Sequence, residues 1–308
     1  MRKPPSPTLI LAYPVSGGLG LFAVAVTLMI ELKRLSIDRF VVAPVAFWHE
    51  PWRLFLSVFP HVGLVHLVFN AYWLWVLGTV LEEVFGHAKT AALIVLFAVV
   101  PMTAEFALFD GGVGLSGVNY GLVGLLWVLS KRDRRFAEAM DQRTVNLMVA
   151  WFFICIALTV TKVQPVANVA HGVGALLGVL VGVVLVEKRA AFRALAGLGL
   201  VAVVAGSAAG ATTLRSRINL SRTAGQQIAH DAYVAVEDGR LEQGIALYKQ
   251  AIAMSPREAG YWFNLGIAQA RVGRPDEARA DFQKAFELDP KNPKFRDAAR
   301  PESDTPSP

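Results

Sequence analysis

Seven long apolar blocks constrain the fold of this chain more than any other feature of its sequence. Each block is about as long as an α-helix that crosses the hydrocarbon core of a bilayer. Hydrophobic side chains make up 54% of the 308 residues and charged ones 18%, which is more apolar than a typical soluble protein. Helices buried inside a large soluble protein would show polar faces on most of the blocks. The sequence therefore predicts a polytopic membrane protein, with apolar blocks at residues 17–32, 62–81, 88–108, 115–130, 145–161, 166–186 and 192–213.

The basic residues gather at the ends of the apolar blocks. They do not interleave with aromatic side chains, so the net charge of +6 indicates membrane topology and not nucleic-acid binding. The loops after the fourth and sixth blocks are the most basic and are predicted to be cytoplasmic, although Lys33, Arg34 and Arg39 after the first block weaken this bias. The N-terminus is then cytoplasmic and the C-terminus external. We read the first block as a retained helix, because no convincing signal-peptide cleavage site follows it.

The C-terminal part repeats itself at a fixed offset. GRLEQGIALYKQAIAMSP begins at Gly239 and GRPDEARADFQKAFELDP begins at Gly273, which is 34 residues later. This is the period of tetratricopeptide repeats, which the segment 226–293 resembles. The resemblance implies helical hairpins that bind a peptide or a partner protein; a purely stabilising cap is the alternative. Two repeats are fewer than the three usually needed for independent stability.

The composition divides the chain into five parts. We predict a disordered N-terminal segment at 1–16, a membrane domain at 17–214, a linker at 215–225, the repeats at 226–293 and a disordered tail at 294–308. The expected fold is all-α: a membrane bundle of six core helices plus a seventh, followed by a small helical-repeat domain.

Polar residues inside three of the blocks are candidates for function, because polar groups are expensive in a bilayer. His66 and Asn70 are four residues apart and share one helix face. The segment GGVGLSGVNYGLVG brings Ser116 to the start of a helix, after a flexible entry that includes Gly114. In NVAHGVGALLGVLVG, His171 precedes glycines on its own face. Two glycine stripes let the serine and histidine helices approach closely; they comprise Gly117, Gly121 and Gly124, and Gly174, Gly178 and Gly182.

These residue types suit peptide hydrolysis. A serine hydroxyl becomes a strong nucleophile when a histidine takes its proton, and the oxyanion needs donors, for which His66, Asn70 and the Ser116 amide are available. No carboxylate lies near His171 in the sequence of its block, so the prediction is a dyad, with the Tyr120 ring packed against the imidazole. We predict no metal site, because the HxxxN pattern has no carboxylate or cysteine beside it, and no cofactor.

HVGLVHLVFN, GLSGVNYG and AHGVGALLG occur in this order on alternate blocks. Together they resemble the rhomboid intramembrane serine proteases over about residues 17–213. The resemblance implies a dyad of Ser116 and His171, an oxyanion site with His66 and Asn70, and Tyr120 stacked on the histidine. It also matches Trp52 and Arg53 to a first-loop WR pair, and Glu82 to a structural carboxylate. Gly172 and the polar Asn119 depart slightly from the family pattern.

The expected function is an intramembrane serine endopeptidase that cleaves transmembrane or juxtamembrane segments of membrane proteins. Its expected partners are transmembrane substrates, the lipid bilayer and a protein or peptide at the repeats, and not nucleic acid. The expected location is the bacterial inner membrane, with the repeats on the external or periplasmic side. The alternative hypothesis is a catalytically silent rhomboid-like protein that binds membrane clients. A third hypothesis is a transport protein.

Overall fold

The computed structural model describes residues 3–42, 49–221 and 224–300, and the helices in them are all α or 3-10. The prediction of an all-α membrane protein with a helical-repeat domain is confirmed. The chain forms two compact units, Met1–Ile218 and Asn219–Pro308.

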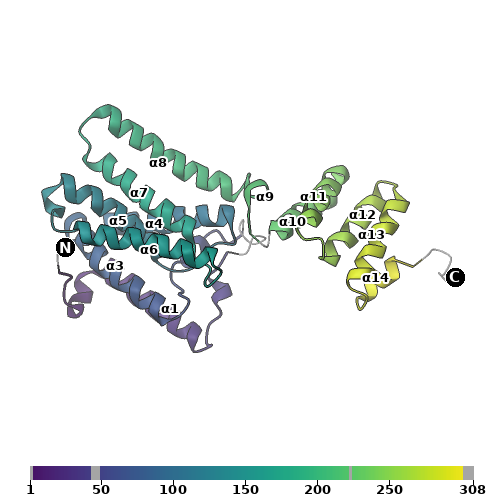
Figure 1. Ribbon diagram of the computed structural model, residues 1–308, viewed down its shortest axis with the longest axis horizontal. Coiled ribbons are helices and arrows are strands. Elements are labelled where there is room, and N and C mark those ends of the chain that lie inside the picture. The colour runs from purple at the N-terminus through teal and green to yellow at the C-terminus, as the bar shows by residue number, and fades with distance from the viewer. Residues whose placement is uncertain (1–2, 43–48, 222–223, 301–308) are drawn as a thin grey trace. The chain divides into compact units, whose positions relative to one another are not determined.

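Seven long helices in the described ranges form most of the first unit, and they are labelled in Figure 1. The helices α4, α5 and α7 form the centre of the unit, since α4 contacts α1, α3, α5, α7 and α8, and α5 contacts α3, α4, α6 and α7. The peripheral helix α8 contacts α4 and α7. The seven helices are α1 Pro14–Glu31, α3 Leu64–Phe85, α4 His87–Leu108, α5 Ser116–Arg132, α6 Gln142–Val160, α7 Asn168–Val186 and α8 Ala190–Ala211.

Six of these seven helices in the described part of the chain are long and apolar enough to cross a membrane. The exception is α5, which has 17 residues and is about 25 Å long at the usual rise. A hydrocarbon core is about 30 Å thick, so α5 by itself is slightly shorter than this thickness. Its bounds agree with the predicted block at 115–130 to within two residues at each end.

The glycine stripes allow the backbones of α5 and α7 to touch. A Cβ on Gly174 would overlap the carbonyl oxygen of Gly117, and one on Gly178 would overlap the carbonyl oxygen of Gly121. Gly117 differs from the other members, since its own Cβ would meet only ordinary contacts at 3.4 Å or more. Close approach of these two helices therefore depends on Gly174 and Gly178 more than on Gly117.

The sequence predicts a disordered N-terminal segment up to residue 16, but the structure is helical over most of residues 7–16. Pro7–Ala12 forms the 3-10 helix η1, and α1 already begins at Pro14. The indole of Trp75 donates to the carbonyl oxygen of Pro5 at 3.0 Å. The carboxylate of Glu82 accepts the amide N–H groups of Val15 and Ser16 at 2.9 and 2.8 Å, which caps the start of α1.

The predicted linker at 215–225 also begins too early. Arg215–Ile218 forms the short helix α9 within the first unit. The Arg215 guanidinium donates to the carbonyl oxygen of Phe109 at 3.0 Å and lies 3.7 Å from the centre of the Phe106 ring. These contacts attach residue 215 to the end of α4, so it belongs to the membrane domain.

The second unit consists of helical hairpins. Gly239 and Gly273 both adopt a φ of +78° directly after the first helix of a hairpin, which matches the offset of 34 residues. The predicted tail at 294–308 starts with a helix, because Phe295 is buried and its ring lies 5.0 Å from that of Phe263; residues 301–308 lie outside the described part. The helices are α10 Ala224–Glu237, α11 Leu241–Met254, α12 Ala259–Arg271, α13 Pro275–Leu288 and α14 Pro293–Ala298.

Candidate active site

Ser116 and His171 meet at the N-terminal ends of α5 and α7. The Oγ atom of Ser116 lies 2.7 Å from Nε2 of His171, a distance typical of a strong hydrogen bond. When the serine donates this bond, the imidazole hydrogen sits on Nδ1. That Nδ1 has no hydrogen-bond partner among the residues the structure describes. The geometry is that of a serine–histidine pair without an acid bonded to the imidazole.

The Tyr120 ring lies against the imidazole of His171. The two ring centres are 4.7 Å apart and the planes are tilted by 32°. The phenol hydroxyl donates to the carbonyl oxygen of Met148 at 3.1 Å, so Tyr120 is itself anchored to α6. A ring held in this way restricts how far the imidazole can rotate.

Two polar contacts hold the loop before Ser116. The Gly114 amide donates to the carbonyl oxygen of Ser57 at 3.1 Å, and the Leu115 amide donates to Nε2 of His61 at 3.2 Å. The other ring nitrogen of His61 lies 2.9 Å from the carbonyl oxygen of Phe59 and must donate to it. The imidazole hydrogen therefore lies on Nδ1, and Nε2 accepts the Leu115 amide N–H.

His66 lies beside this loop. Gly114 has a φ of +105°, and a Cβ there would lie 2.9 Å from Cε1 of His66. Glycine is therefore required both by the backbone conformation and by the histidine. The ring of His66 also packs edge-on against that of His61, with their centres 4.9 Å apart.

Asn70 is hydrogen-bonded to Asn119 in the first turn of α5. The side-chain nitrogen of Asn119 donates to Oδ1 of Asn70 at 2.9 Å and to its carbonyl oxygen at 3.0 Å. Nδ2 of Asn70 donates to the carbonyl oxygen of His66 at 2.9 Å. The structure thus places all the predicted polar residues, namely Ser116, His171, Tyr120, His66 and Asn70, around the starts of α5 and α7.

Glu105 is a residue that the sequence reasoning missed. It is 4% exposed within α4, and its Oε2 accepts the amide N–H of Ala170 at 3.0 Å. The carboxylate therefore caps the helix that carries His171, next to the histidine itself. It is 65 residues away in sequence, and its only signal was an acidic residue inside an apolar block.

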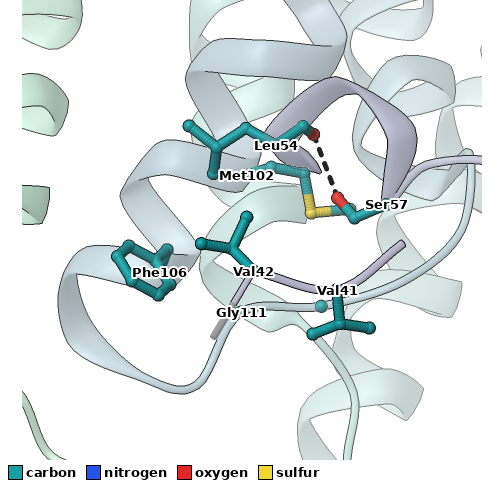
Figure 2. A pocket seen from close by; sticks show the side chains of 8 residues that line it. Val41, Val42, Leu54, Ser57, Met102, Phe106 and Gly111 are labelled. Atoms are coloured by element: carbon teal, nitrogen blue, oxygen red, sulfur yellow. Dashed lines mark hydrogen bonds between the residues drawn. The ribbon is translucent and has the colours of Figure 1, made fainter. Parts of the chain in front are cut away.

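A small cavity lies beside the loop 109–115, which contributes Gly111 to its lining (Figure 2). Its volume is about 10 Å³, and its lining includes Val42, Leu54, Met102 and Phe106. The hydroxyl of Ser57 beside it donates to the carbonyl oxygen of Leu54 at 3.0 Å. This volume is at the lower limit for one water molecule, so the cavity is not a pocket for a substrate side chain.

Comparisons with known proteins agree with the motifs. Residues 48–188 match the family model of the rhomboid domain, and residues 232–293 match that of the tetratricopeptide repeat. The chain is 30% identical over 129 residues to rhomboid protease GlpG of Klebsiella pneumoniae (strain ATCC 700721 / MGH 78578), and 31% identical over 135 residues to rhomboid protease GlpG of Yersinia pseudotuberculosis serotype I.

These alignments include 40% and 42% of this chain. The chain spans 46% of the length of each of these two relatives. The rhomboid-domain match at residues 48–188 includes the serine and histidine motifs, and the names of the relatives support an intramembrane protease family. The chain is thus an integral membrane protein that carries a rhomboid domain at residues 48–188 and tetratricopeptide repeats at residues 232–293.

Proposed function

We propose that this protein is an intramembrane serine endopeptidase that cleaves transmembrane or juxtamembrane segments of other membrane proteins. The distance of 2.7 Å between Ser116 Oγ and His171 Nε2 is the observation that carries the proposal. A client-binding protein without activity has no need of a serine in hydrogen-bond contact with a buried histidine.

In the proposed reaction, Oγ of Ser116 attacks the scissile carbonyl carbon while Nε2 of His171 takes the hydroxyl proton. The carbonyl oxygen becomes an oxyanion, with the Ser116 amide, the Asn70 side-chain nitrogen and His66 as its proposed donors. His171 then gives its proton to the leaving amine, which leaves an acyl-enzyme on Ser116. Water activated by His171 hydrolyses this ester and restores the pair.

The proposed orientation follows from the basic loops. Arg132 lies 3.8 Å from Glu187, so the loops after α5 and α7 lie at the same end of the membrane unit. Both loops are rich in lysine and arginine, which favours the cytoplasmic side. The N-terminus is then cytoplasmic, and the repeats lie on the external side of a bacterial inner membrane, where they bind a peptide or protein partner.

The proposal is tested with a fluorophosphonate probe on the detergent-solubilised full-length protein. We expect labelling of the wild type and of Ser207→Ala, and none of Ser116→Ala. Ser207 is a matched control, because its hydroxyl is also buried in a membrane helix, α8, but donates only to the carbonyl oxygen of Val203. Equal labelling of Ser116→Ala and wild type contradicts the proposed nucleophile, and a folded but unlabelled wild type favours the silent client-binding protein.

A further inference from the structure

The contact between Asn119 and Asn70 joins two buried carboxamides. Asn70 is 2% exposed and Asn119 is 5% exposed. The side-chain nitrogen of Asn119 donates hydrogen bonds to both the side-chain oxygen and the main-chain oxygen of Asn70. A reversed Asn119 amide would set its oxygen against these two oxygens, so only one orientation of Asn119 is compatible with the contact.

This contact also sets the orientation of Asn70. Its oxygen faces the Asn119 donor, and its nitrogen faces the carbonyl oxygen of His66. A primary amide nitrogen carries two hydrogens, and the bond to His66 uses one of them. No second acceptor for this nitrogen is found among the described residues, so the other hydrogen can bind an oxyanion. In the reversed orientation Asn70 would present its oxygen to the developing negative charge, which is repulsive.

Asn119 keeps this contact at a cost to folding. Its own Oδ1 is buried and has no hydrogen-bond partner within the described ranges, and a buried acceptor without a partner is destabilising. The neighbouring Val118 and Leu122 on α5 are apolar and fully buried. An apolar side chain at position 119 would avoid the unpaired oxygen, so packing alone does not account for an asparagine there.

We propose that Asn119 is a positioning residue that holds the Asn70 carboxamide with its nitrogen toward the substrate carbonyl. This inference rests on the proposed function, because it assigns Asn70 to the oxyanion site. It adds that the site is built from α3 and α5 together, and that a residue that does not touch the substrate determines whether Asn70 can act as a donor.

The test measures cleavage of a transmembrane reporter by full-length protein in liposomes, with kcat expressed per active site titrated by fluorophosphonate. Losing an oxyanion donor typically lowers kcat by about 10²–10³-fold, so a loosened donor in Asn119→Ala should lower it by about tenfold, with KM changed less than about twofold. Leu122→Ala, which removes buried volume one turn further along α5, should have a smaller effect on kcat. If Asn119→Ala does not fold, Asn119→Leu fills the space and replaces it in every comparison.

The same substitution is then made in an Asn70→Ala background. If Asn119 acts through Asn70, its removal there changes kcat by less than about twofold, because coupled residues are not additive. An unchanged kcat per active site in Asn119→Ala, or an equal tenfold loss in the Asn70→Ala background, overturns the inference. A wild type that does not cleave or label overturns the proposed function instead, so the two failures are distinguishable.

Discussion

Substitution of Gly178 by alanine should separate the two helices that carry Ser116 and His171. The added Cβ would lie 2.8 Å from the amide nitrogen of Leu125 and 2.9 Å from the carbonyl carbon of Gly121, with the Gly121 oxygen closer still. All three are backbone atoms of α5, so no side chain can rotate away. Relief to an ordinary contact requires roughly 1 Å of movement between α5 and α7, at an overpacking cost of about 1–3 kcal/mol.

The same movement acts on the proposed catalytic pair, Ser116 and His171. An additional 1 Å takes the Ser116–His171 contact from 2.7 Å to about 3.7 Å, beyond hydrogen-bond range. A misplacement of this size can lower turnover by about a hundredfold. We expect Gly178→Ala to lose about that much kcat in a liposome cleavage assay, while circular dichroism still shows a helical protein.

Gly206→Ala is the matched control for this substitution. Gly206 is also a glycine inside a membrane helix, α8, but a Cβ there would meet nothing within 4 Å. It should retain wild-type activity and gain a few tenths to about 1 kcal/mol of stability from better helix propensity. If Gly178→Ala keeps more than half of the wild-type kcat, the helix contact does not set the dyad geometry and the reasoning fails.

Substitutions at three further positions have defined outcomes. Glu105→Ala leaves the buried Ala170 amide unpaired and should lower stability by about 1–3 kcal/mol and reduce kcat; Glu105→Gln keeps an acceptor and should lose less, which thermal unfolding and cleavage assays measure. Gly114→Ala should slow fluorophosphonate labelling, because its Cβ would lie 2.9 Å from His66; wild-type labelling contradicts this. Burial raises the pKa of Asp281 from 3.8 to about 6. The folded repeats therefore bind more protons than the unfolded chain in this range, and their stability falls as pH rises through it. Asp281→Asn should stabilise α13 above pH 6 by about 1–2 kcal/mol in amide hydrogen exchange, and a gain of the same size at pH 3 contradicts this cause.

Local pattern accounts for the parts of the structure that the sequence predicts well. Apolar block length indicates the long helices of the membrane unit, and the offset between Gly239 and Gly273 indicates the helical hairpins. The contact between Ser116 and His171 is indicated by two glycine-rich helix starts, one with the serine and one with the histidine. Each of these signals lies within one short segment of the chain, where the spacing of residues directly determines which side chains share a face.

Other contacts depend on residues far apart in sequence, and local pattern does not reveal them. The bond from the Ala170 amide to Glu105 and the bond from the Leu115 amide to His61 need a particular rotation of each helix about its axis. The ordered start of α1 likewise depends on Glu82, which lies one helix away. Sequence spacing fixes the faces of a helix but not their rotation against a neighbour, so these partners could only be found in the structure.

The absence of an acid bonded to His171, among the described residues, shifts the orienting role to packing and to the backbone. In a Ser–His–Asp triad the acid fixes the tautomer and direction of the imidazole. Here Tyr120 limits rotation of the ring from one side, and Glu105 acts on the Ala170 amide next to it, so the carboxylate orients the helix and not the ring. His61 does the same for Ser116 through the Leu115 amide. We therefore expect Glu105→Ala to displace His171 as a whole, so that kcat falls at every pH with the shape of its pH profile unchanged; a changed profile would instead show that Glu105 stabilises the charged imidazole directly.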